Sequence, residues 1–136
     1  LPERVNHELL AWLGDTKLKP VIVVHANHAQ ELDESVRQAL AALKDAGAEL
    51  LNQSVLLRGV NDSVEALADL SEALFEAGTL PYYLHMLDKV QGAAHFEVPD
   101  AAARRLTEAL NARLPGYLVP RLVREVPGGP GKVALS

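Results

Sequence analysis

The chain of 136 residues contains no cysteine, one methionine and one tryptophan. Without cysteine it can form no disulfide, no thiolate metal site and no cysteine-held iron–sulfur cluster of its own. It has no long basic run, and its net charge of −5 makes nucleic acid a poor partner. No apolar run is long enough to span a bilayer, and no signal-peptide pattern is present. We therefore expect a cytoplasmic location.

Two common phosphate-binding motifs are also missing. The glycine-rich segment 127–131 is flanked by Val126 and Val133, where a P-loop requires glycine and then serine or threonine. No Gly-x-Gly-x-x-Gly sequence opens a helix. These absences argue against nucleotide binding by either route, although the backbone amides of such a loop could cradle a cofactor phosphate.

The composition that is present is typical of a globular domain with a real core, at 49% apolar and 23% charged residues. Helical periodicity predicts helices near residues 6–13, 33–47, 62–78 and 99–116. Apolar runs predict strands at 20–25, 49–57, 80–87 and 118–123. Asp33 and Asp62 are candidate N-caps, with Glu65 as a capping-box partner of Asp62, and Pro99 suits a first helical turn.

Two of the predicted helices end in Ala-Gly directly before an apolar strand, at residues 46–47 and 77–78. This repetition predicts an α/β fold of repeated βα units that feed a parallel sheet. Such a chain forms either a small open sheet or the second half of a TIM-like (βα) barrel. In both cases, ligand chemistry is expected beyond the carboxyl ends of the strands.

Polar residues at those strand ends, with Asn52 and Gln53 inside the second strand, are the candidates for a functional site: His25, Asn27, His28; Asn52, Gln53, Arg58, Asn61, Asp62; His85, Asp88, Lys89, Gln91, His95; Arg124, Glu125 and Lys132. Each has a plainer alternative. The two histidines His25 and His28 suit a metal pair or a hydrogen-bonded loop. Asn61 and Asp62 suit a turn and helix cap.

Lys132 follows the glycine-rich loop beyond the last predicted strand. A lysine in this position is well placed to form a Schiff base, because partial burial favours the neutral amine that attacks an aldehyde. The alternative is a solvated lysine near a frayed terminus. Asp88 and Glu125 follow adjacent strands, so they are expected to face one pocket and to hold an ammonium group by charge-assisted hydrogen bonds.

Three segments carry a family resemblance, together with the terminal glycine-rich loop and Lys132: LNQSVLLRGVND at 51–62, PYYLHMLDKVQGAAHF at 81–96 and GYLVP at 116–120. With these segments the chain resembles the lysine 2,3-aminomutase family of radical S-adenosylmethionine enzymes. It is most similar to the branch that makes β-lysine for modification of elongation factor P. The resemblance covers nearly all of residues 1–136.

The resemblance implies conversion of L-lysine to β-lysine by movement of the amino group from C2 to C3. It also implies pyridoxal phosphate, S-adenosylmethionine and a 4Fe–4S cluster as cofactors. Lys132 matches the lysine that holds pyridoxal phosphate, and Asp88 matches one of two acids that bind the substrate ε-ammonium. Glu125 stands where other members have the second acid, an aspartate. His28 and Gln53 are similar to positions near S-adenosylmethionine.

The family's Cys-x-x-x-Cys-x-x-Cys cluster motif is absent, so the resemblance implies that residues 1–136 form the C-terminal half of the barrel. The first residue is Leu, and we expect an excerpt from a longer protein whose N-terminal half is the natural partner. The fragment alone is expected to be inactive. Two alternatives stay open: a non-catalytic module that forms homo-oligomers through open sheet edges, and a pyridoxal phosphate protein without radical chemistry.

Overall fold

The computed structural model describes residues 2–87, 94–126 and 131–135. Its α-helices are α1 (His7–Asp15), α2 (Glu34–Asp45), α3 (Val64–Glu76) and α4 (Asp100–Arg113). Its strands are β1 (Val21–Val24), β2 (Glu49–Leu56), β3 (Thr79–Met86), β4 (Arg121–Val126) and β5 (Gly131–Ala134). Within these residues, no helix has the length and apolar character that crossing a membrane requires.

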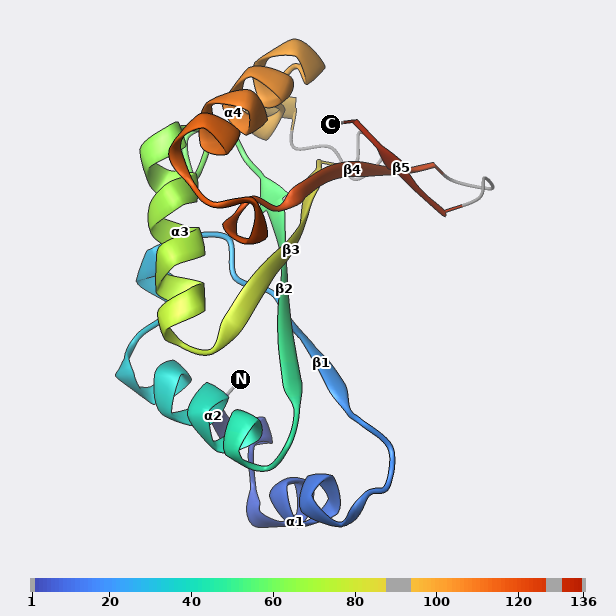
Figure 1. Ribbon diagram of the computed structural model, residues 1–136. Coiled ribbons are helices and arrows are strands. Elements are labelled where there is room, and N and C mark those ends of the chain that lie inside the picture. The colour runs from blue at the N-terminus through green and yellow to red at the C-terminus, as the bar shows by residue number, and fades with distance from the viewer. Residues whose placement is uncertain (1, 88–93, 127–130, 136) are drawn as a thin grey trace.

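The strands form one sheet in the order β1-β2-β3-β4-β5. The first four strands are parallel and each pairs with the next along the chain, which confirms the predicted α/β class and parallel sheet (Figure 1). The fifth strand was not predicted. It pairs antiparallel with β4, and its register places Lys132 opposite Glu125. Residues 131–134 are therefore part of the sheet and not the loose terminus that the plainer interpretation assumed.

Of three predictions about helix starts, the structure confirms one and contradicts two. Asp33 caps α2 by accepting a hydrogen bond from Val36 N, as predicted. Ser63, not Asp62, caps α3. The Asp62 side chain instead accepts a hydrogen bond from Gly59 N, within the short loop between β2 and α3. Pro99 is the N-cap residue of α4 and not part of its first turn.

The last α-helix ends earlier than predicted, and the strand that follows it starts and ends later. Helix α4 stops at Arg113, and a 3-10 turn over Gly116–Leu118 occupies the start of the predicted fourth strand. Strand β4 therefore begins at Arg121 and extends to Val126. This shift carries Arg124 and Glu125 into the strand, where their side chains point to opposite faces of the sheet.

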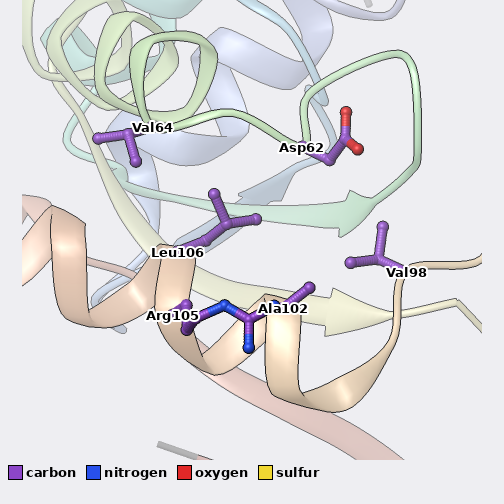
Figure 2. Close-up of a pocket in the computed structure, with 6 residues that line it drawn as sticks. All are labelled: Asp62, Val64, Val98, Ala102, Arg105 and Leu106. Carbon is purple, nitrogen blue, oxygen red and sulfur yellow. The ribbon is translucent and has the colours of Figure 1, made fainter.

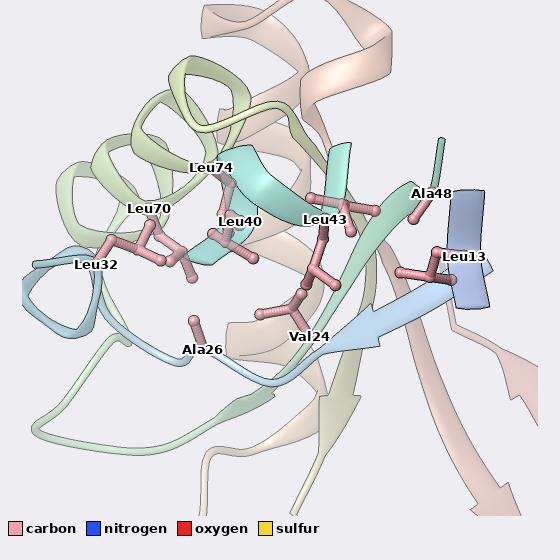
Figure 3. Packing of buried hydrophobic residues seen from close by; sticks show 10 residues of the cluster. Leu13, Val24, Ala26, Leu32, Leu40, Leu43, Ala48, Leu70 and Leu74 are labelled. Atoms are coloured by element: carbon pink, nitrogen blue, oxygen red, sulfur yellow. The ribbon is translucent and has the colours of Figure 1, made fainter. Parts of the chain in front are cut away.

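Helices α2, α3 and α4 all lie on the same face of the sheet (Figure 1). Two clusters of buried side chains fill the space between these helices and the strands. Figure 3 shows the first cluster, in which Val24 of β1 packs near Leu40 and Leu43 of α2 and Leu74 of α3. The second cluster contains Leu56, Leu67, Leu84, Leu110 and Leu122, from the central strands and from α3 and α4. Burial of these side chains is what fixes the helices to the sheet.

The opposite face of the sheet carries no helix among the described residues, and we call it the open face. On β2 the burial alternates strictly, so that Leu50, Asn52, Ser54 and Leu56 are buried beneath the helices. The intervening residues Leu51, Gln53 and Val55 lie on the open face and are half-buried. The open face is therefore accessible, and its side chains can meet a ligand or another polypeptide segment.

Two asparagine side chains, buried at Asn52 and half-buried at Asn27, connect the carboxyl end of β1 to β2. The Asn52 side chain accepts a hydrogen bond from Ala26 N at 2.9 Å and donates one to Ala26 O at 3.1 Å. The Asn27 side chain accepts one from Val55 N at 2.9 Å. Because β1 ends at Val24, these amides continue the pairing of the two chains beyond the last ladder residue.

Asn61 extends this network into the loop after β2. Its side-chain nitrogen donates to Asn27 O and to Val55 O, both at 2.9 Å, and its side-chain oxygen accepts from Leu57 N at 2.8 Å. The residue is fully buried. Asn61 was considered from sequence as a turn residue, and the structure shows that it is the central hydrogen-bonding residue of this edge.

We predict that Asn61→Ala lowers the free energy of unfolding by about 2–4 kcal/mol, since the truncation leaves buried backbone groups without partners. Urea denaturation measures the change. Asn111→Ala is the matched control, because Asn111 is exposed on α4, and it should change stability by less than about 0.5 kcal/mol. Equal effects of the two substitutions would show that the network contributes little.

Candidate active site on the open face

A β-bulge places two aromatic rings of β3 on the open face. Asn52 pairs with Pro81, but the next residue Gln53 pairs with Tyr83, so Tyr82 is an extra residue in β3. An extra residue reverses the alternation of side chains along a strand. As a result, Tyr83 and His85 lie on the same face as Gln53, whereas Leu84 is buried beneath the helices.

Lys132 and Glu125 meet at the carboxyl end of β4. Lys132 Nζ lies 3.4 Å from Glu125 Oε1 and 5.3 Å from the centre of the Tyr83 ring. Arg124, the residue before Glu125, points to the helix side, where its guanidinium binds both carboxylate oxygens of Asp100 at 2.6 and 3.0 Å. Glu125 therefore faces the open side, and Lys132 reaches the same side from β5.

His85 lies beside this ion pair and is held by Gln53. Its Nε2 is 3.1 Å from Gln53 Oε1, and since an amide oxygen only accepts hydrogen bonds, Nε2 carries the proton. Burial lowers the pKa of His85 below 6.5, and the nearby charge of Lys132 lowers this pKa further, against the opposing effect of Glu125. At neutral pH the ring is neutral, so Nδ1 is free of a proton.

The rings on this face contact one another. Tyr83 and His85 meet edge to face with ring centres 5.8 Å apart. Tyr82 and Tyr83 lie closer, at 4.1 Å, and a hydrogen bond between their side chains raises the pKa of Tyr82. The arrangement is a polar and aromatic surface on which an amine, an imidazole and a carboxylate are close together. Sequence analysis did not identify Tyr83, because its place on this face depends on the bulge.

The other predicted site residues are distributed differently. His28 lies in the loop after β1 as the N-cap residue of a 3-10 turn over Ala29–Glu31, where its Nδ1 accepts a hydrogen bond from Gln30 N and its backbone N donates one to Glu31. It takes the loop role that was one of its two interpretations. Three further candidates, Asp88, Lys89 and Gln91, lie outside the described residues.

A cavity of about 290 Å³ lies on the helix side and not at the candidate site. It is lined by Asp62, Val64, Val98, Ala102, Arg105 and Leu106, between α4 and the start of α3 (Figure 2). The strand-end candidate Asp62 lines this cavity, whereas Lys132 and Glu125 do not. The chemistry predicted for Lys132 and Glu125 therefore belongs to the open face.

The residues present suit some of the expected cofactors and not others. Lys132 has the chemistry for covalent attachment of pyridoxal phosphate: a primary amine on the open face, with a carboxylate and a neutral imidazole nearby. A cysteine-held cluster does not fit this chain, which has no cysteine. Among residues 2–87, 94–126 and 131–135, no group of three histidine or acidic side chains is arranged to hold a metal ion.

The fold defines the class of protein. A crystal structure of a radical SAM methyltransferase from Sphaerobacter thermophilus superimposes with a TM-score of 0.63 over 87% of this chain and 38% of that one. The sequence identity is 16%, so the likeness is one of fold. The chain thus has the architecture of part of a radical SAM α/β fold. No protein-family model matches the sequence.

Sequence relatives make the family explicit. The chain is 53% identical over its full length to the L-lysine 2,3-aminomutase of Escherichia coli, 47% identical over 97% of its length to that of Haemophilus influenzae, and 41% identical over 97% to that of Clostridium subterminale. It spans 40%, 39% and 32% of those proteins, respectively. Over nearly its whole length the chain is thus similar to L-lysine 2,3-aminomutases, and it corresponds to about two fifths of the Escherichia coli relative.

The lowered pKa of His85 predicts a pH dependence of stability. The unfolded state binds the proton more tightly than the folded state does, so the free energy of unfolding falls as pH drops from 6.5 toward the folded pKa. Above pH 6.5 this effect disappears. Urea denaturation between pH 5 and 8, roughly the histidine range, measures it. His85→Asn should flatten the decline, whereas the exposed-site control His7→Asn should keep it; an unchanged slope in His85→Asn would contradict the assignment.

Proposed function

We propose that this chain is the C-terminal half-barrel of an L-lysine 2,3-aminomutase and supplies the lysine that holds pyridoxal phosphate. The observation that carries the proposal is the meeting of Lys132 and Glu125 on the open face, at the carboxyl end of β4. The similarity to L-lysine 2,3-aminomutases over the whole chain supports the same reaction, an isomerisation of L-lysine to β-lysine. An enzyme of this kind requires the part of the barrel that these residues do not include.

Each residue has a distinct task in the proposed site. Lys132 attaches pyridoxal phosphate, which supplies the electron-accepting group that binds the migrating nitrogen. Glu125, together with Asp88, binds the ε-ammonium of L-lysine by charge-assisted hydrogen bonds. The neutral His85 ring, oriented by Gln53, accepts or returns a proton beside the amine of Lys132.

S-adenosylmethionine and the 4Fe–4S cluster belong to the longer protein in this proposal. Gln53 lies on the open face in the middle of β2 and His28 in the loop after β1, and we propose that S-adenosylmethionine binds on this side. The cluster ligands are expected outside residues 1–136, because this sequence contains no cysteine. We further propose that the product β-lysine serves the modification of elongation factor P, on the basis of the sequence segment 87–96.

The function is tested in the longer protein that contains this chain, or in a mixture of this chain with the remaining half. With S-adenosylmethionine, pyridoxal phosphate and a reductant, we expect L-lysine to be converted to β-lysine. Lys132→Ala should lower the rate by roughly a hundredfold or more, since the group that binds the cofactor is lost. Borohydride reduction followed by peptide mapping should label Lys132.

Lys44→Ala is the matched control for this experiment. Lys44 also pairs with a glutamate, Glu49, at 3.2 Å, but at the amino end of β2. Its loss should leave both the rate and the label in place. Label on a lysine other than Lys132 would refute the assignment, and a longer protein that forms no β-lysine would refute the reaction.

The second candidate function is self-association. The open face and its β1 edge expose Val21, Val23, Leu80 and Tyr82, each with more than a third of its surface accessible. An unpaired strand edge next to apolar side chains favours pairing with another chain. Sedimentation of this chain over a range of concentrations tests this candidate: a homo-oligomer that persists after the missing half is added would favour it over the half-barrel proposal.

A further inference from the structure

The ion pair of Lys132 and Glu125 affects the order in which pyridoxal phosphate and L-lysine bind. Glu125 is the acid expected to receive the ε-ammonium of the substrate, yet its carboxylate already receives an ammonium from the same chain, at 3.4 Å. The face of the Tyr83 ring also contacts this ammonium, with Lys132 Nζ 5.3 Å from the ring centre. A carboxylate and an aromatic face together form a binding site for a primary alkylammonium ion.

The pairing of β4 and β5 places the Lys132 ammonium next to the Glu125 carboxylate. Lys132 and Glu125 are register partners in the antiparallel β4–β5 pair, so their side chains emerge next to each other on the open face. Gly131 begins β5 with a φ of +97°, a conformation that a side chain would strain, and Lys132 follows it directly. The side chain of Lys132 is less exposed, at 32%, than that of Glu125, at 68%, so it covers the ring and leaves part of the carboxylate open.

We infer that Lys132 acts as an internal competitor for the alkylammonium site formed by Glu125 and Tyr83, and that attachment of the cofactor frees this site for the substrate. The inference rests on the proposed function, since it uses the same lysine and the same acid. An amine bonded to the cofactor can no longer give its ammonium to Glu125. Lysine therefore binds productively after pyridoxal phosphate and poorly before it.

Binding of L-lysine to the full-length protein freed of pyridoxal phosphate tests the inference. Lys132→Met keeps the length of the side chain and removes its charge. Calorimetry should show that this variant binds L-lysine about three- to tenfold more tightly than the wild type, the factor expected for losing one exposed ion pair and one cation–π contact. Norleucine, which lacks the ε-ammonium, should bind equally to both proteins.

Substitutions at two further positions identify the site. Glu125→Gln, combined with Lys132→Met, should abolish the gain in lysine affinity. Tyr83→Leu in the same background should weaken lysine binding by about two- to fivefold, while Tyr83→Phe should not, since only the ring face is used. Lys44→Met, which removes the Glu49 ion pair at the other end of the sheet, and Tyr117→Leu, which alters an exposed ring packed on Phe75, are the matched controls.

Equal affinities of wild type and Lys132→Met for L-lysine would overturn the inference, as would an equal gain for norleucine or no lysine binding by Lys132→Met. The β-lysine assay on the cofactor-loaded wild type is read separately. A gain in lysine affinity without β-lysine formation would support the role of Lys132 as an internal competitor and refute the proposed reaction. Normal β-lysine formation with no gain in affinity would leave the reaction standing and refute the competitor.

Discussion

The hydrogen bonds of the Asn27, Asn52 and Asn61 side chains hold β1, β2 and the loop after β2 together at the carboxyl side of the sheet. Strand β1 has only four residues, so its own ladder ends before the edge where chemistry is expected. Asn52 and Asn27 continue the connection between β1 and β2, and Asn61 ties Asn27 and Val55 to the following loop. A buried amide satisfies its neighbours only in one geometry, which makes this edge a fixed base for the side chains that project from it.

On that base, two departures from regular geometry place the reactive groups. The bulge at Tyr82 turns Tyr83 and His85 to the same face as Gln53, and the return strand β5 carries Lys132 back over Glu125. A perfectly regular β3 would have placed both Tyr83 and His85 beneath the helices. Irregular pairing next to an active site is a recurring way in which sheets redirect side chains.

In the part of the chain that the structure describes, helices cover one face of the sheet and leave the other open, and this asymmetry links the fold to the proposed function. The helix side is filled by leucine, valine and alanine, whereas the open face mixes apolar residues with an amine, an imidazole and a carboxylate. Relatives of this chain are more than twice its length, so in proteins of that family this face has further polypeptide available to enclose it. Enclosure would remove water from Lys132 and Glu125 and strengthen their interactions with a charged substrate.

The sequence by itself determined the βα repeat, the parallel sheet and the edge that carries the polar residues, because apolar periodicity and helix stops such as Gly47 and Gly78 act locally. It also indicated the family resemblance, through the long and specific residue segments 51–62, 81–96 and 116–120. It did not determine that Ser63 rather than Asp62 caps α3, since both suit the role and only the loop geometry separates them. The fifth strand, the bulge and the ion pair of Lys132 with Glu125 were decided by the tertiary structure alone. Each depends on the register between strands, which is set by pairing across the sheet and not by neighbours along the chain.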